Sequence, residues 1–345
     1  MATIHDIAQI SGYSIGTVSR VINNRADVSE KARKKIEAVI REQGFQPNSS
    51  ARTLRQSMSS EVYIVVRGIA NTFLQSLLEK TQIRIGEHGE SAGAGVQFIK
   101  EAEDEVAVAA KIMQDIKPKG LVFLGGNTDT FQQAFSGFTV PSVLISADAE
   151  SLGFDNLSSF TTDDRDAGGC AARALVSKGH RRIGILGGYP GDAGGEQSGN
   201  GPSLRIRGAV EELERSGVSF DFARDYEPCP FSAEAGYQAA KRLLARAPDL
   251  TAVFAISDSL AIGAMRAFRD MGLHIPRDIS LVGFDGVVAT RYTIPRLATI
   301  EQDVELLARR GVDDLLMRIS YEGPAVHEKI PYRFVDGESI ARPRT

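Results

Sequence analysis

Apolar residues recur every three or four positions along the first part of the chain, which is the spacing of amphipathic helices. Thr3 begins a capping-box-like pattern ahead of the first helix, and Gly12 is placed to end that helix. Ser14 can cap a second helix and Ser29 a third. The pattern therefore predicts a small domain of three short helices within residues 1–47.

From residue 61 onward the pattern changes to short apolar runs that alternate with amphipathic stretches. The apolar runs, each predicted to be a strand, are 61–69, 95–101, 120–126, 141–146, 181–188, 252–257 and 279–285. The amphipathic stretches, each predicted to be a helix, are 72–89, 104–116, 166–179, 260–272 and 305–319. Such alternation is typical of parallel sheets covered on both faces. A stretch of this length is too long for one sheet, so we expect an α/β body of two similar, doubly wound lobes.

These patterns divide the chain into a head, a linker and a body. We assign residues 1–47 to the helical head and residues 48–60 to a short helix followed by a Ser-rich linker. Residues 61–340 form the body. Within it we expect lobe 1 to comprise about 61–161 plus 291–320, and lobe 2 about 162–290 plus 321–340.

Charge is distributed unevenly along the chain. Residues 1–60 hold nine Lys or Arg and five Asp or Glu, a net charge of +4, whereas the whole 345-residue chain carries −4. The rest of the chain therefore carries −8, and a basic head on an acidic body favours a nucleic-acid partner for the head.

Several classes of protein are disfavoured by what the sequence lacks. Its two cysteines, Cys170 and Cys229, have no disulfide-framework or metal-site spacing. We see no signal peptide and no membrane-spanning apolar run, so we expect a soluble, cytoplasmic protein. No nucleophile elbow, phosphate-binding loop or metal-spaced His and Cys set is present, so we expect neither an enzyme nor a bound metal or cofactor.

The second predicted helix has the features of a helix that enters a groove of DNA. Residues 14–24 read SIGTVSRVINN and contain one arginine and no acid. Ala8 is a small residue on the preceding helix, Gly12 lies in the turn, and Val18 is placed as the inward anchor, a spacing that resembles the helix-turn-helix pattern. Arg20 can make a bidentate hydrogen bond to guanine, the commonest specific contact in the major groove.

The resemblance extends from this motif over nearly the whole chain. Residues 3–55 resemble the DNA-binding head of the LacI/GalR (lactose-repressor) family of bacterial regulators. The body matches family blocks in the family's order at LVSKGHRRIGILGG, SLRIRGAVEEL, AISDSLAIGAMRAFRDMGLHIPRDISLVGFDG and PRLATIEQD. The resemblance implies a transcriptional repressor that binds a pseudo-palindromic operator as a homodimer. Its body would resemble periplasmic sugar-binding proteins, with a small effector between the lobes.

The same resemblance assigns the DNA-binding residues. Residues 15–22 would form the recognition helix, with Ile15 and Gly16 as the pair that sets operator preference. The stretch NSSARTLR would form a hinge helix that folds on DNA and inserts Leu54 into the minor groove. The residues expected to contact DNA are Thr3, Ser14, Ile15, Gly16, Thr17, Ser19, Arg20, Asn23, Asn48, Ala51 and Leu54.

Carried over in the same way, six residues are expected to contact the effector. Phe73 and Phe231 would offer apolar faces, and Arg205 and Asp285 would offer opposed charges, which suits a hydroxyl-rich ligand such as a sugar. The list is completed by two departures from the family pattern, Ser146 in place of an acid and Ser257 in place of an asparagine.

Other interpretations remain open on the sequence alone. The stretch ATRYTIPRLATIEQ mildly resembles purine-repressor sequence, so a purine-type corepressor is an alternative to a sugar. A solute-binding protein is a further alternative, against which the basic head argues. We expect the Gly-rich stretch 187–202 to be a lid beside the cleft and His180 to be a surface turn residue.

The assignment of Arg20 can be tested directly. Arg20→Ala is expected to abolish discrimination between operator and scrambled duplex while leaving salt-sensitive binding, because phosphate contacts carry no sequence information. Fluorescence anisotropy on a duplex selected by the wild-type protein from a random library measures both quantities. Unchanged preference for the selected duplex would contradict the assignment.

Overall fold

The computed structural model of the chain describes residues 4–13, 17, 18, 21, 29–43, 62–87, 94–189, 200–321 and 323–344. The chain forms two compact units, Met1–Ser59 and Ser60–Thr345. They correspond to the basic head with its linker and to the acidic body.

The head is a small helical unit. Helix α1 spans Ile4–Ser11 and α3 spans Glu30–Glu42, while residues 17, 18 and 21 between them are also helical. The apolar core of the head consists of Ile7, Ala8, Val18, Val21, Ile36 and Val39. Two predicted boundaries are confirmed. Gly12 follows α1 with a φ of 75°, and the Ser29 side chain accepts a hydrogen bond from the Ala32 amide at the start of α3.

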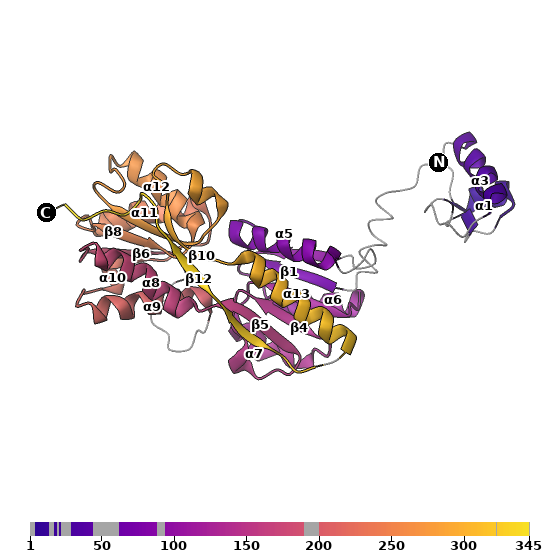
Figure 1. The fold of residues 1–345 in the computed structure, drawn as a ribbon, viewed down its shortest axis with the longest axis horizontal. Coiled ribbons are helices and arrows are strands. Elements are labelled where there is room, and N and C mark those ends of the chain that lie inside the picture. The colour runs from indigo at the N-terminus through magenta and orange to yellow at the C-terminus, as the bar shows by residue number, and fades with distance from the viewer. Residues whose placement is uncertain are drawn as a thin grey trace. The chain divides into compact units, whose positions relative to one another are not determined.

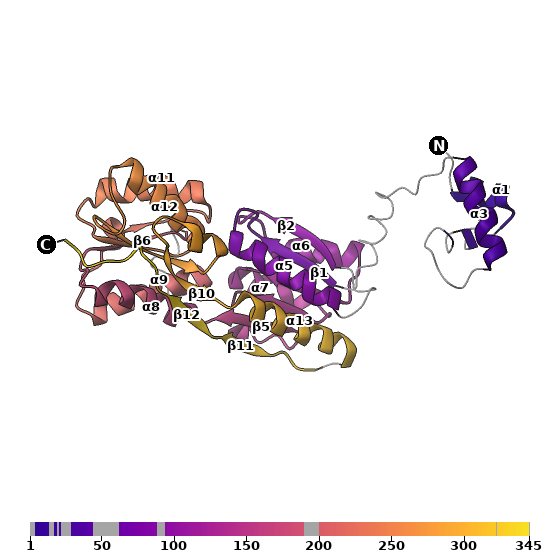
Figure 2. The same cartoon turned by 45° about the horizontal axis from the view of Figure 1, so that its top comes forward.

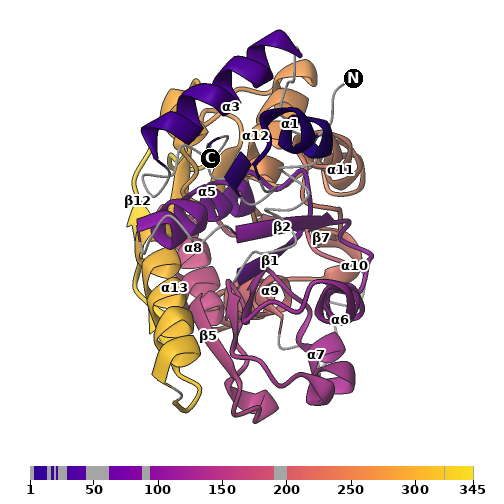
Figure 3. The same ribbon diagram turned by 90° about the vertical axis from the view of Figure 1, so that its right-hand side faces the viewer.

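Lobe 1 is built on six described parallel strands in the order β11-β5-β4-β3-β1-β2. The strands are β1 (Val62–Arg67), β2 (Ala94–Ile99), β3 (Gly120–Leu124), β4 (Ser142–Ile145), β5 (Leu157–Thr162) and β11 (His327–Ile330). Helices α5 (Thr72–Glu87) and α13 (Val304–Tyr321) cover one face, and α6 (Glu105–Asp115) and α7 (Thr128–Ala134) cover the other (Figure 3). The expected doubly wound α/β fold is confirmed for this lobe.

Lobe 2 repeats the plan, with described strands in the order β12-β10-β9-β8-β6-β7. The strands are β6 (Ile183–Leu186), β7 (Tyr226–Glu227), β8 (Ala252–Ala255), β9 (Ser280–Asp285), β10 (Ala298–Gln302) and β12 (Tyr332–Val335), and all described pairings are parallel except β10 with β12. Helices α8 (Asp164–Ser177) and α9 (Gly201–Arg215) lie on one face, with α11 (Ala233–Arg246) and α12 (Asp258–Asp270) on the other (Figure 1). The short α10 (Phe222–Asp225) precedes β7.

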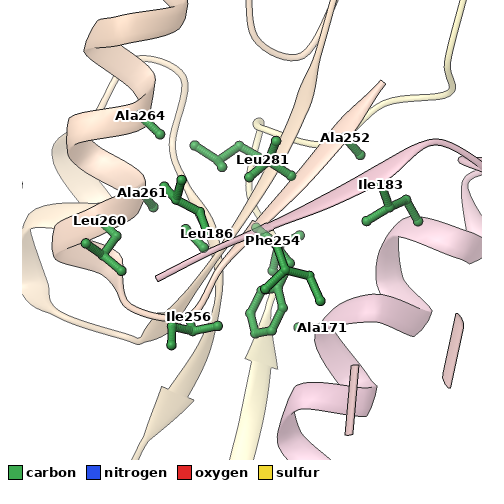
Figure 4. Close-up of a cluster of buried hydrophobic side chains, with 14 of the residues drawn as sticks. Ala171, Ile183, Leu186, Ala252, Phe254, Ile256, Leu260, Ala261, Ala264 and Leu281 are labelled. Carbon is green, nitrogen blue, oxygen red and sulfur yellow. The ribbon is translucent and has the colours of Figure 1, made fainter. Parts of the chain in front are cut away.

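The largest apolar core fills lobe 2. Figure 4 shows Leu260, Ala261 and Ala264 of α12 beside the sheet residues Leu186 and Phe254, all completely buried. Small residues on α12 allow the helix to lie close to its neighbour α11, since a Cβ added to Gly263 would come within 1.9 Å of the Ala233 carbonyl oxygen. Such close packing makes the lobe a rigid support for the loops at the strand ends.

The described chain passes between the lobes three times, between β5 and α8, between β10 and α13, and between β11 and β12 (Figure 2). These passages correct the expected lobe boundaries at two places. Residues 291–302, expected in lobe 1, include β10 of the lobe 2 sheet, and residues 321–330, expected in lobe 2, include β11 of the lobe 1 sheet. Short strands that border a passage between the lobes have no local pattern that shows which sheet they join.

Some strands lie outside the expected runs because they are short or polar. Strand β5 reads LSSFTT and is buried along its whole length. Because four of its six residues carry hydroxyl groups, it lacks the apolar run that predicts a buried strand. Strand β7 has only two residues, and β11 is the partly exposed run HEKI. Strands β10, which reads ATIEQ, and β12, which reads YRFV, also lie outside the expected runs. The other strands of the body, β1, β2, β3, β4, β6, β8 and β9, lie within those runs or differ from them by one residue at an end.

The structure also shows that the expectation for His180 was wrong. Its side chain is 1% exposed, although it follows a turn. The ring Nδ1 lies 2.9 Å from Thr251 Oγ1, and Nε2 lies 2.9 Å from the Ala341 carbonyl oxygen and 3.0 Å from Ser280 Oγ. Because a carbonyl oxygen only accepts, Nε2 carries the hydrogen, and the neutral ring joins β9 and the C-terminal segment to the α8–β6 turn.

This environment predicts a pH-dependent stability. Burial lowers the pKa of His180 below its usual 6.5. The unfolded chain therefore binds more protons than the folded one, and the stability present above pH 6.5 is lost as the pH falls below it. We expect His180→Ala to lower the free energy of unfolding by about 3 kcal/mol at pH 7.5 and to flatten this acid-side slope. Urea unfolding between pH 5 and 7.5 measures both, with the exposed His274→Ala as control. An unchanged slope would contradict the assignment.

Candidate functional site

A cavity of about 770 Å³, including its opening to solvent, lies between the two lobes. Its walls are formed where strands of both sheets end: β1, β2, β3 and β4 on one side and β6 and β9 on the other, together with the first turns of α5 and α9. The carboxyl ends of parallel strands are where α/β proteins bind small ligands, because the loops there meet and backbone groups are exposed.

Five of the six residues predicted to contact an effector line this cavity. Phe73 and Ser146 come from lobe 1, and Arg205, Phe231 and Asp285 come from lobe 2. Ser257 does not line the cavity. It is completely buried, caps α12 by accepting a hydrogen bond from the Ser259 amide, and bonds the Asp285 carboxylate from behind. Ser257 therefore holds the Asp285 carboxylate in place by this hydrogen bond.

Two glycines explain why Arg205 reaches the cavity. A Cβ at Gly168 of α8 would come within 2.1 Å of the Arg205 carbonyl oxygen, and a Cβ at Gly208 of α9 would come within 1.7 Å of the Arg165 carbonyl oxygen. Helices α8 and α9 can therefore lie in backbone contact only because both positions are glycine. This contact places Asp164, at the start of α8, beside the Arg205 side chain.

Arg205 is the centre of a buried network of charges. Its Nε donates to Asp164 Oδ1 at 2.7 Å, and its Nη1 donates to the Ile256 carbonyl oxygen at 2.9 Å and lies 3.3 Å from Asp285 Oδ1. The guanidinium carbon lies 3.8 Å from the centre of the Phe284 ring. Arg205, Asp164 and Asp285 are all at most 6% exposed, so each charge depends on the others for solvation.

Burial dominates the acid–base chemistry of this network. It raises the pKa of Asp285 to about 6, although Arg205 and the hydrogen bonds from Ser257 and Gln302 act in the opposite direction. Burial likewise raises the pKa of Asp164. Behind them, burial and then the charge of Asp285 raise the pKa of Asp258 well above its usual value. This side of the cavity is therefore rich in buried carboxyl groups whose charged form is disfavoured by burial.

Asp258 fixes the turn that follows Asp285. Its Oδ2 accepts hydrogen bonds from the amides of Gly286 at 2.6 Å and Val287 at 2.8 Å, and its Oδ1 accepts one from Thr299 Oγ1 at 2.6 Å. Asp285 itself has a φ of 115°, a strained value for a residue with a side chain. Ser146 on the opposite wall has a φ of 74°. Backbone strain of this kind gathers at binding sites, where the surroundings hold an unfavourable conformation.

The lobe 1 wall carries a second arginine. Arg67, the last residue of β1, donates from Nε and Nη2 to the Glu101 carbonyl oxygen and lies 3.3 Å from Glu105 Oε1. Glu105 is completely buried and also accepts hydrogen bonds from the Asn127 amide and the Thr130 hydroxyl. Arg67 thus ties the end of β1 to the residues after β2, Glu105 extends the link to Asn127 after β3, and Arg67 also lines the cavity.

Sequence reasoning missed several polar residues that line the cavity: Arg67, Asn71, Glu101, Asn127, Tyr189 and Asn200. Each lies at or just after the carboxyl end of a strand, or just before a helix. A rule that collects polar residues at the carboxyl ends of predicted strands could have found most of them. The resemblance alone did not, because these positions lie outside the motifs that carry it.

The predicted DNA-contacting residues fall almost entirely outside the described residues. This applies to Thr3, Ser14, Ile15, Gly16, Ser19, Arg20, Asn23, Asn48, Ala51 and Leu54, and most of the Gly-rich stretch 187–202 also lies outside them. Thr17 is described as a half-buried helical residue next to the buried Val18. The DNA-binding roles therefore stay predictions at the level of single residues.

The described residues contain neither a membrane-spanning helix nor a cluster of metal-ligating side chains. No helix among them is long and apolar enough to cross a lipid bilayer. In the same part of the chain, no group of three or more His, Cys, Asp or Glu side chains is arranged to hold a metal ion.

Comparison with known proteins identifies the family. Residues 3–48 match the family of bacterial regulatory proteins of the lacI type, and residues 172–340 match a periplasmic binding protein-like domain. The chain is 30% identical to the HTH-type transcriptional regulator MalR of Clostridium butyricum over 97% of its own length and 98% of that protein. The chain belongs to the lacI family.

Further relatives agree with this placement of the lacI-family protein. GalR of Escherichia coli K12, an HTH-type transcriptional regulator, is 30% identical over 91% of this chain and 88% of its own. The crystal structure of the lac repressor dimer bound to operator and the anti-inducer ONPF superposes with a TM-score of 0.68 at 25% identity and covers 99% of both chains. The lacI-family protein is therefore a DNA-binding transcriptional regulator with a helix-turn-helix head and a two-lobed body.

The Arg205 network makes a prediction about stability. Arg205→Ala leaves Asp164 and Asp285 buried without their counter-charge, and it should lower the free energy of unfolding by about 4 kcal/mol at pH 8. Without the arginine the folded-state pKa of both carboxyl groups rises further, so stability is lost as the pH rises and the deficit should be smaller at pH 5. Urea unfolding at both pH values tests this. Arg266→Ala, which breaks an exposed ion pair with Asp270, should change the free energy of unfolding far less than Arg205→Ala at both pH values. Equal deficits at both pH values would contradict the network.

Proposed function

We propose that this regulator is a repressor whose affinity for its operator is controlled by an uncharged, hydroxyl-rich effector, most simply a sugar, bound in the cavity between the lobes. The observation that carries the proposal is the composition of the cavity walls. Phe73 and Phe231 offer apolar faces from opposite lobes, and Arg205 and Asp285 offer a donor and an acceptor from one side. Sugars present this combination of apolar C–H faces and hydroxyl edges.

The charges around the cavity support an uncharged ligand. Both arginines that line it in the described chain already face carboxylates, Arg67 at Glu105 and Arg205 at Asp164 and Asp285. A phosphate or carboxylate ligand needs cations or amides that are free to pair with it. The first turn of α9 also faces the cavity, but Asn200 caps it and the Asp164 carboxylate lies against Gly201. An anionic ligand would therefore meet carboxyl groups on both sides.

The comparisons support the DNA-binding side of the proposal. The lac repressor, 25% identical, is described as a dimer bound to its operator. By analogy we propose that this protein acts as a homodimer on a pseudo-palindromic operator and has no enzymatic activity. Because its target is bacterial DNA, it would act in the cytoplasm. A change in the lobes would alter how the two heads of the dimer fit the operator, with a coupling free energy of about 1–3 kcal/mol.

The proposal is tested by a thermal-shift screen of the purified protein. The panel pairs uncharged sugars with their phosphates and with the corresponding sugar acids, and adds nucleosides and nucleobases. A ligand at about 100 times its dissociation constant stabilises a protein by about 2.7 kcal/mol, which is readily measured. We expect stabilisation by one or more uncharged sugars and none by the matched phosphates. A nucleobase that stabilises the protein instead would favour a purine-type corepressor and contradict the proposal.

The stabilising sugar then tests the site. Asp285→Asn should weaken its binding about 10- to 100-fold, because an ionised acceptor is replaced by an amide. Asp270→Asn is the matched control, since Asp270 lies on the surface of α12 and not in the cavity. Titration calorimetry gives both affinities. Equal affinities for the wild type and Asp285→Asn would remove Asp285 from the site. Failure of the sugar to change operator binding in an anisotropy assay would contradict its role as effector.

A further inference from the structure

We propose that a hydrogen bond between Tyr189 and Glu101 is a latch that holds the two lobes closed over the cavity. The Tyr189 hydroxyl donates to Glu101 Oε2 at 2.6 Å. Tyr189 follows β6 of lobe 2 and Glu101 follows β2 of lobe 1, so the bond joins the lobes directly. Both residues also line the cavity.

This bond lies far from the passages that connect the lobes, so it is sensitive to rotation of one lobe against the other. The three passages of the described chain between the lobes involve β5, β11, β10 and β12, which lie at one edge of the two sheets. Strand β2 lies at the opposite edge of the lobe 1 sheet, and β6 is next to β7 at the opposite edge of the lobe 2 sheet. Rotation of the lobes about the passages would move atoms at these far edges the most. A hydrogen bond there is therefore broken by any substantial opening of the cleft.

Each end of the bond is fixed to its own lobe. On lobe 1, the Glu101 carbonyl oxygen accepts from Arg67, and the Glu101 side chain lies against Gly68, where a Cβ would come within 3.3 Å of Cγ. On lobe 2, the Tyr189 carbonyl oxygen accepts from the Tyr226 hydroxyl, and the Tyr189 ring centre lies 6.4 Å from that of Phe231. Because both groups are held in place before they meet, little conformational entropy is lost when the bond forms.

A second hydrogen-bond contact also joins the two lobes. The hydroxyl oxygens of Thr72, at the start of α5, and Ser259, in the first turn of α12, are 3.0 Å apart. This contact joins two uncharged groups, whereas the Tyr189 contact has a carboxylate acceptor and is the stronger type. Tyr189 and Glu101 are thus positioning residues that set the balance of open and closed cleft. Their role in retaining an effector rests on the proposed function, but the latch itself is a property of the protein without ligand.

The test measures the separation of the lobes without any ligand. Spin labels are placed on the full-length protein through Lys111→Cys on α6 and Ala223→Cys on α10, two exposed positions, after Cys170→Ser and Cys229→Ala remove the native thiols. Double electron–electron resonance then gives the distribution of distances across the cleft. Tyr189→Phe and Glu101→Met each remove the bond, and Tyr237→Phe removes a comparable bond to Asp270 within lobe 2 and is the matched control.

We expect one dominant short distance in the labelled parent and in Tyr237→Phe. Tyr189→Phe and Glu101→Met should each raise the open-to-closed ratio about tenfold, the order expected for one hydrogen bond to a charged group. The double variant should open the cleft no further than either single variant. The parent distribution in both single variants, or shifts that add in the double variant, would overturn the latch. Circular dichroism establishes that each variant is folded, and Glu101→Met decides the question alone if Tyr189→Phe does not fold.

Discussion

The buried guanidinium of Arg205 is the interaction on which the candidate site depends. It neutralises Asp164 at the start of α8 and Asp285 at the end of β9, and it donates to the Ile256 carbonyl oxygen after β8. Three elements of lobe 2 therefore meet at one side chain. A buried charge without a partner is strongly destabilising, so the network can persist only while all of its members are in place. The close contact of α8 with α9 through Gly168 and Gly208 provides the geometry that this requires.

The same network connects the cavity to the hinge. Gln302, the last residue of β10, donates to Asp285 Oδ1 at 3.0 Å, and Thr299 of the same strand donates to Asp258. Strand β10 leads directly into α13 of lobe 1 through one of the passages between the lobes. A ligand that pairs with Asp285 would act on a residue that is already bonded to the crossing strand. The structure thus offers a short physical route from the cavity to the relative position of the lobes, which is the kind of element that coupling between two sites requires.

The fold could largely be predicted because its signals are local. The alternation of apolar runs and amphipathic stretches identified most strands and helices of the body, since a strand buried on both faces must be apolar along its length. The caps at Ser29 and Gly12 marked helix ends in the head because a side-chain oxygen and a left-handed glycine satisfy backbone groups locally. The polar strand β5 could not be recognised in this way. Its hydroxyl groups are partly satisfied by distant residues such as Arg318 and His327, which no local pattern reveals.

The sequence by itself determined the family, the two-part organisation of the chain, and five residues that the fold brings together around one cavity: Phe73, Ser146, Arg205, Phe231 and Asp285. These properties follow from short motifs and periodic patterns, which act through the nearest neighbours in the chain. Only the tertiary structure decided that Ser257 supports Asp285 from behind, that His180 is buried between three segments, and that Tyr189 meets Glu101 across the cleft. Each of these depends on contacts between residues far apart in the sequence, and such contacts exist only after the sheets and the passages between the lobes have formed.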